Sequence, residues 1–152
     1  MRILVAEDSW TDLHVLKVSL DENLTGRYDL VECRDGDQVF RFIDSLDSGS
    51  ECTCPDLIIV DLHLPKGNGA EILSRIRSSP RLKNTPVAIL SGSDEIDGRR
   101  LARSFEPCHY FRKAGTLAEF MGIGNALMQF ASGTRPPEPH VQTAIAMSSP
   151  RT

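Results

Sequence analysis

Short apolar runs alternate with longer amphipathic stretches along most of this chain. Residues 3–6, 57–60 and 87–90 form continuous runs rich in branched side chains, and these runs are too short to be buried helices. They predict central strands of a parallel sheet. Residues 28–33 and 108–112 mix polar with apolar side chains, which is typical of edge strands that are covered less completely. The pattern therefore predicts a sheet of five strands.

Apolar residues recur at helical spacing in the stretches that separate and follow these runs. The recurring residues are Leu13, Leu16, Leu20 and Leu24; Val39, Phe40, Ile43 and Leu46; Ile72, Leu73 and Ile76; Leu101, Ala102 and Phe105; and Leu117, Phe120, Met121, Leu127 and Met128. Alternating strands and helices predict an α/β fold, in which right-handed crossovers place helices on both faces of a doubly wound sheet. Functional groups in such folds gather at the carboxyl ends of the strands.

One domain accounts for most of the chain, because 152 residues are too few for two ordinary domains. We assign residues 1–131 to this domain. Beyond residue 131 the composition shifts to Ser, Gly and Pro with few large apolar side chains, so we interpret residues 132–152 as a disordered tail. The one apolar patch in this tail, residues 141–147, leaves docking on a neighbouring protein open.

Charge and hydropathy argue against several classes of protein. With 17 basic and 21 acidic residues, the net charge is -4 and the sequence has no dense Lys/Arg stripe, so we expect no nucleic-acid binding. The apolar runs are shorter than the roughly 20 residues of a membrane span, and the beginning of the chain lacks a signal-peptide core. We expect a cytoplasmic protein whose cysteines, Cys33, Cys52, Cys54 and Cys108, are free thiols.

The residues just past the predicted strands are charged or carry a hydroxyl group. They are Glu7, Asp8, Asp61, Ser91 and Lys113. The doubly wound fold would bring them into one cleft, where three carboxylates repel one another unless protons or a cation neutralise them. Because Mg²⁺ prefers oxygen ligands and binds through one or two carboxylates plus phosphate oxygens, the acids predict a site for Mg²⁺, or for Mn²⁺.

The same side chains are suited to phosphoryl transfer, which needs a nucleophile, a metal ion and fixed donors for the phosphoryl oxygens. Asp61 follows a central strand and precedes a sharp loop, residues 64–69, that would leave its carboxylate open to attack phosphorus. Lys113 would supply positive charge and Ser91 a hydroxyl donor. The sequence therefore predicts an aspartate that accepts a phosphoryl group.

Four segments carry a family resemblance: ILVAEDS, LIIVDLHLPKGNG, VAILSGS and YFRKAG. Over residues 2–131 the chain resembles two-component response-regulator receiver domains, because the functional positions occur in the same order at the strand ends. The resemblance implies a flavodoxin-like (βα)5 fold with strand order 2-1-3-4-5. It also implies that Glu7, Asp8, Asp61 and the backbone carbonyl of His63 hold the metal ion, and that Ser91 and Lys113 contact the phosphoryl group.

The resemblance further implies a switch formed by Ser91 and Tyr110. In such proteins the hydroxyl moves toward the phosphoryl group and the aromatic ring turns inward, which repacks the face that binds partners. The added charge and hydrogen-bond acceptors would bias a surface with two stable arrangements.

Two departures from the common receiver pattern suggest a subfamily. Ala114 follows the lysine where proline is usual, and Asn68 stands where Asp is common. With the long final helix, these features resemble small stand-alone receivers that partner bacterial phytochrome-type histidine kinases. Such proteins are often homodimers through the last helix, and Ile123, Leu127 and Phe130 form a second apolar stripe there that predicts a dimer contact.

The expected function is that of a single-domain response regulator, phosphorylated on Asp61 by a histidine kinase and signalling through protein–protein interaction rather than as an enzyme. Three alternatives remain. A receiver that works without phosphorylation would not need the complete set of site residues. A Mg²⁺-dependent phosphatase with an aspartate nucleophile needs a second Asp where this chain has His63. A flavodoxin-like module would need a phosphate loop rich in Ser, Thr and Gly in place of Glu7 and Asp8.

Overall fold

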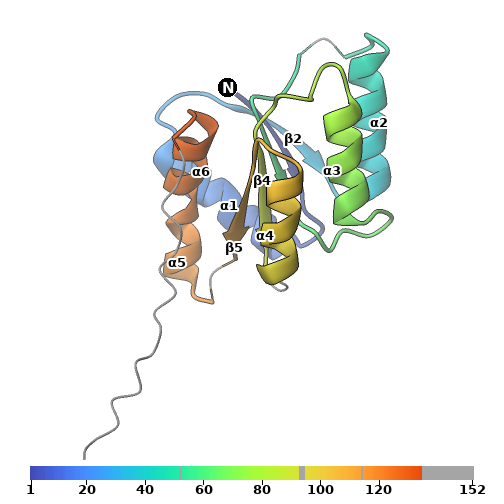
Figure 1. The fold of residues 1–152 in the computed structure, drawn as a ribbon. Coiled ribbons are helices and arrows are strands. Elements are labelled where there is room, and N and C mark those ends of the chain that lie inside the picture. The colour runs from blue at the N-terminus through green and yellow to red at the C-terminus, as the bar shows by residue number, and fades with distance from the viewer. Residues whose placement is uncertain (52, 93–94, 114, 135–152) are drawn as a thin grey trace, which may run out of the picture.

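The computed structural model describes residues 1–51, 53–92, 95–113 and 115–134. Its centre is a parallel sheet of five strands in the order β2-β1-β3-β4-β5, as predicted (Figure 1). The strands are β1 Arg2–Ala6, β2 Asp29–Cys33, β3 Leu57–Val60, β4 Val87–Ser91 and β5 Cys108–Arg112. Three of them, β1, β3 and β4, have neighbours on both sides, which explains why their sequences are almost entirely apolar.

Helices cover both faces of the sheet (Figure 1). They are α1 Trp10–Asn23, α2 Gly36–Asp47, α3 Gly69–Ser78, α4 Glu95–Ser104, α5 Leu117–Met121 and α6 Ile123–Ala131. Helices α1, α5 and α6 pack on one face, and α2, α3 and α4 on the other. Each face has its own apolar core, because alternate residues of the central strands point to opposite sides of the sheet.

The end of the chain differs from the expected single long helix. The helix is interrupted at Gly122, so that α5 and α6 are separate elements. Gly124 then approaches α1 closely: its backbone N–H donates to the Ser19 hydroxyl at 2.9 Å, and a Cβ at Gly124 would lie 2.6 Å from the Ser19 carbonyl oxygen. Glycine is therefore required by close packing of α6 on α1 within the same chain.

This packing corrects the prediction of an uncovered apolar stripe. Ile123 is only 8% exposed and Leu127 is fully buried, and both lie in the core formed with α1. They are already covered within one chain, so the reasoning that made them dimer contacts is wrong for these two residues. Phe130 is half-buried and packs against Phe111 and His109.

Several expectations fall partly or wholly outside the described residues. These are the tail from residue 135 onward, Cys52 and Ala114. The other cysteines, Cys33, Cys54 and Cys108, are free thiols as expected. Among the described residues, the helices are all too short or too polar to cross a bilayer.

Strand register places the site residues beside one another. Ala6 in β1 pairs with Val60 in β3, so the next residues, Glu7 and Asp61, leave the sheet as neighbours. The Asp61 backbone N–H continues the ladder by donating to the Ala6 carbonyl at 3.0 Å. On the other side, the Lys113 N–H donates to the Ser91 carbonyl at 2.9 Å. The carboxyl edge of the sheet therefore holds these side chains on a rigid backbone.

Candidate functional site

Glu7 and Asp8 lie in the tight connection between β1 and α1. Ser9 caps α1 by accepting a hydrogen bond from the Asp12 N–H at 3.2 Å, and the Glu7 carboxylate accepts from the Ser9 N–H at 3.0 Å. These bonds hold the Glu7 side chain toward the centre of the site. The helix therefore begins directly beside the acids, where its positive N-terminal end favours negative charge.

Three carboxylates meet at the carboxyl edge of the sheet. One oxygen from each of Glu7, Asp8 and Asp61 lies within 4.8 Å of the others. Glu7 and Asp61 are buried, whereas Asp8 is exposed. Burial raises the pKa of Glu7 above its usual value, and the neighbouring Asp61 carboxylate acts in the same direction against the Lys113 ammonium. A cluster of this composition suits a hard divalent cation with oxygen ligands.

The Lys113 ammonium is the positive centre of the site. Its Nζ donates to Glu7 at 2.7 Å and to both Asp61 and Asp12 at 2.8 Å. Burial alone would lower the pKa of Lys113, but the three carboxylates raise it, so the side chain is charged across the physiological range. An ammonium group has three protons, and each has a carboxylate partner here.

Asp12 is a site residue that the sequence analysis missed. It lies in the first turn of α1, and its carboxylate forms an ion pair with Lys113 at 2.8 Å. Its side chain is 38% exposed, in contrast to the buried Glu7 and Asp61 partners of the same lysine. The available signal was its position in the first turn of the helix that follows the acidic pair.

Asp61 is held by its own loop as well as by Lys113. The His63 backbone N–H donates to Asp61 Oδ1 at 2.9 Å, while Oδ2 accepts from Lys113. The loop then turns sharply at Lys66, whose φ of 58° is left-handed. Gly36 packs against the carbonyl of Lys66, where a Cβ would come within 2.4 Å of the oxygen. The His63 side chain is exposed.

Ser91 and Tyr110 are adjacent on β4 and β5 at the same edge. Ser91 is fully buried and Tyr110 is 4% exposed. The Tyr110 hydroxyl donates to the Ser91 backbone carbonyl at 3.3 Å. The pair expected to form a switch is thus in direct contact, with the aromatic ring turned inward.

Arg34 lies at the edge of the site and contacts two of its neighbours. Its guanidinium lies 3.8 Å from the centroid of the Trp10 ring, and its Nη2 donates to the Asp8 carbonyl at 2.5 Å. Trp10 itself is 73% exposed, so its ring covers the arginine rather than filling the core. Arg34 therefore positions the backbone that carries Asp8, a role with no motif in the sequence.

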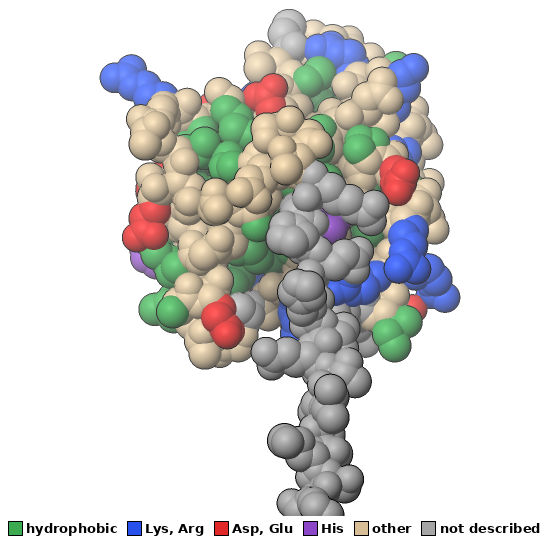
Figure 2. Space-filling model, turned by 60° about the vertical axis from the view of Figure 1, so that its left-hand side comes forward, with side chains coloured by type: hydrophobic (Ala, Val, Ile, Leu, Met, Phe, Trp, Pro, Cys, Tyr) green, Lys and Arg blue, Asp and Glu red, His purple; other side chains and the backbone are tan. Residues whose placement is uncertain are grey.

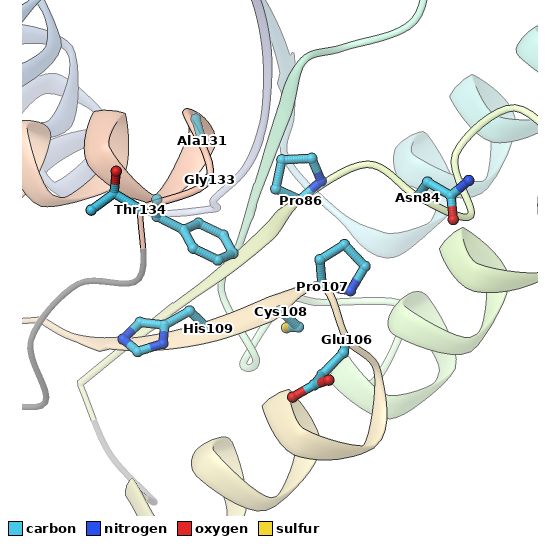
Figure 3. A pocket seen from close by; sticks show the side chains of 10 residues that line it. Asn84, Pro86, Glu106, Pro107, Cys108, His109, Ala131, Gly133 and Thr134 are labelled. Carbon is cyan, nitrogen blue, oxygen red and sulfur yellow. The ribbon is translucent and has the colours of Figure 1, made fainter.

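A hollow lies at the opposite edge of the sheet, where β4 and β5 begin (Figure 3). It measures about 660 Å³ and is lined by Asn84, Pro86, Glu106, Pro107, Cys108, His109, Phe130, Ala131, Gly133 and Thr134. None of the site residues lines it.

On the face shown in Figure 2, basic side chains lie in separate groups with acidic side chains between them, which differs from a continuous phosphate-binding stripe.

The fold and the cluster of acids around Lys113 define a class of protein. The profile of the response regulator receiver domain family matches residues 3–121. The chain belongs to that family, whose members are signalling modules of two-component systems.

The relatives of this chain are response regulators, and one of those with a solved structure is a phytochrome response regulator. It is 35% identical over 128 residues to Response regulator Rcp1 of Synechocystis, covering 84% of this chain and 86% of that protein. The crystal structure of the phosphorylated cyanobacterial phytochrome response regulator RcpA matches with a TM-score of 0.76 at 30% identity, covering 90% of this chain and 98% of RcpA. The Mn²⁺-bound form of Rcp1 matches with a TM-score of 0.75 at 28% identity, covering 90% and 99% of the two chains.

Proposed function

We propose that this chain is a response regulator that accepts a phosphoryl group on Asp61 from a histidine kinase. The observation that carries the proposal is the arrangement around Asp61. A buried carboxylate lies 2.8 Å from a lysine ammonium, beside two further acids that can hold a divalent cation. A solved relative is phosphorylated and another binds Mn²⁺. We propose that this phosphoryl transfer takes place in the cytoplasm.

The metal ligands in this proposal are Glu7, Asp8, Asp61 and the backbone carbonyl of His63. The oxygen donor set and the spacing of the three carboxylates fit Mg²⁺ or Mn²⁺. When bound, the ion neutralises charge on the phosphoryl oxygens. The negative charge that it requires is already concentrated at the site, where Lys113 now provides the balancing positive charge.

The transfer itself forms one bond and breaks one. An Asp61 oxygen bonds to phosphorus while the phosphorus–nitrogen bond to the kinase histidine breaks, and the imidazole takes up a proton. The Lys113 ammonium already donates to the Asp61 carboxylate. After the transfer it would donate to the phosphoryl oxygens, where the negative charge then lies. The His63 N–H holds the other carboxylate oxygen at 2.9 Å, which limits the rotation of Asp61.

The phosphoryl group would act on partners through Ser91 and Tyr110. Ser91 lies one strand away from Asp61, and its carbonyl already accepts from the Tyr110 hydroxyl. New charge at Asp61 would draw the Ser91 hydroxyl and change the packing of Tyr110 against α4. The output is protein binding at this face. The partner kinase is of the phytochrome type, a proposal supported by the relative RcpA, a phytochrome response regulator.

Intact-mass spectrometry tests the central proposal. The native protein is incubated with phosphoramidate and Mg²⁺, next to Asp61→Asn and Asp37→Asn, a matched change of an exposed acid in α2. We expect one phosphoryl adduct on the native protein and on Asp37→Asn, and none on Asp61→Asn. An unmodified native protein, or equal modification of all three, refutes phosphorylation at Asp61.

Partner binding and phosphate release, measured on the same three proteins, separate the alternatives. A receiver that acts without phosphorylation would bind its partner equally before and after treatment, even in Asp61→Asn. A phosphatase would release phosphate from many donor molecules per protein without accumulating an adduct. The exposed His63 occupies the position where such a phosphatase needs its second Asp, so we expect turnover no faster than decay of the adduct.

A further inference from the structure

Gly98 in α4 lies against the ring of Tyr110. A Cβ built on Gly98 would stand 2.3 Å from Cε2 and 2.4 Å from Cδ2 of that ring. Real Cβ atoms essentially never approach another heavy atom within 3.0 Å. The α4 backbone therefore touches the tyrosine at a distance that only glycine permits.

The close approach belongs to the inward position of Tyr110. In this position the ring is 4% exposed and its hydroxyl donates to the Ser91 carbonyl. The Arg99 guanidinium lies 5.7 Å from the ring centroid on the α4 side. The ring thus joins the end of β4 to the first turn of α4, and Gly98 is the point of contact on the helix.

Glycine is otherwise a poor choice at this position. Gly98 is the fourth residue of α4, inside the helix, where glycine is less favourable than alanine. Its φ is not left-handed, so the backbone conformation does not require glycine. The contact with Tyr110 is the feature that would be lost with any larger residue.

We propose that Gly98 is the positioning residue that admits Tyr110 to its inward position. A side chain at residue 98 would force the ring outward or push α4 away from β5. Residue 98 therefore sets the equilibrium between the two positions of the aromatic ring. This inference rests on the proposed function, in which Ser91 and Tyr110 form the switch.

A double-mutant cycle tests the contact through the stability of unphosphorylated protein. In a Tyr110→Ala background the ring is absent, and Gly98→Ala is expected to raise the folding equilibrium constant about fivefold, the preference of a helix for alanine. In the native background the same substitution is expected to give no gain or a loss. We expect the two effects to differ by at least about tenfold, because overpacking opposes the helical preference.

The position of the ring is measured directly by ¹⁹F NMR of protein labelled with fluorotyrosine. The chain has two tyrosines, so Tyr28→Phe leaves Tyr110 as the sole signal. In the native background we expect a resonance with little solvent-isotope shift, and in Gly98→Ala a resonance with the shift of an exposed ring. Gly26→Ala is the matched control, since a Cβ there meets nothing within 4 Å, and its spectrum should be unchanged.

The outcomes separate this inference from the proposed function. If Gly98→Ala has the same effect on stability with and without the ring and leaves Tyr110 buried, the inference is refuted. If Gly98→Ala alone does not fold, the inference requires that the double variant Gly98→Ala/Tyr110→Ala folds. If the double variant also fails to fold, the inference is refuted. If native protein gains no phosphoryl group from phosphoramidate and Mg²⁺, the proposed function fails while the ring measurement still decides the contact.

Discussion

Replacing Lys113 by methionine probes how strongly the acidic cluster depends on a single cation. The methionine keeps the unbranched apolar part of the side chain and removes the ammonium, which in the native protein donates to Glu7, Asp12 and Asp61 at 2.7–2.8 Å. Two of these carboxylates are buried, with side-chain exposures of 5% for Glu7 and 9% for Asp61. The substitution would leave them facing each other without a counter-charge.

The expected loss of stability in the absence of metal is about 3 kcal/mol. Breaking a buried ion pair by removing one partner costs roughly 3–5 kcal/mol, because the remaining charge stays buried. Two features place this case at the lower end. The Asp12 side chain is 38% exposed and can be solvated, and the raised pKa of Glu7 allows this carboxyl group to take up a proton.

Urea denaturation followed by circular dichroism measures this loss. With a slope of about 2 kcal/mol per molar urea, a loss of about 3 kcal/mol lowers the midpoint by about 1.5 M. The control is Lys17→Met, which removes an ion pair with Glu32 at a partly exposed surface, and it should cost less than about 1 kcal/mol. Each protein is measured with a chelator and again with Mg²⁺.

The response to Mg²⁺ distinguishes an electrostatic cause from a packing cause. A divalent cation would replace the missing charge, so we expect Mg²⁺ to stabilise Lys113→Met more than the native protein. Equal stability of the two proteins in chelator would show that the lysine does not neutralise the cluster. A loss that Mg²⁺ leaves unchanged would instead indicate lost packing of the side chain.

Three other predictions have equally defined outcomes. Mg²⁺ at a hundredfold excess over its Kd should stabilise the native protein by about 2.7 kcal/mol in thermal melts, and Asp8→Asn should weaken that gain. Arg77→Ala should cost about 3 kcal/mol in urea denaturation, because this arginine donates to four backbone carbonyls in two loops. Its control, Arg75→Ala at an exposed ion pair, should cost less than about 1 kcal/mol. Gly124→Ala should destabilise by about 1–3 kcal/mol despite the helical preference for alanine, since its Cβ would meet the Ser19 carbonyl, and a stabilised variant would contradict the close contact.

Much of the site could be predicted because its residues follow strands. Glu7, Asp61 and Lys113 each come directly after a predicted strand, and parallel strands bring their carboxyl ends to one edge. The local sequence is enough to recognise such runs, and the topology rule then supplies the distance between them. The predicted acidic cluster was confirmed for this reason.

Residues that act from helices, or from the connections before them, could not be predicted in the same way. Asp12 and Arg34 look like ordinary polar residues near the beginning of helices, yet one binds Lys113 and the other holds the Asp8 carbonyl. Arg77 resembles a surface arginine of α3, although it joins loops up to 30 residues away. The roles of Asp12 and Arg77 depend on which face of a helix meets the neighbouring elements, and the role of Arg34 depends on the path of the chain between β2 and α2. Hydropathy patterns specify neither for a polar side chain.

The sequence by itself determined the strands, their order of appearance and the acids, hydroxyl and lysine at their ends, because apolar periodicity is a local property. Only the tertiary structure decided that the last helix is interrupted at Gly122 and that Ile123 and Leu127 are covered by α1. It also decided that Gly98 touches Tyr110. These contacts join elements distant in the chain, and their close distances follow from how the helices pack on the sheet, which a linear pattern does not encode.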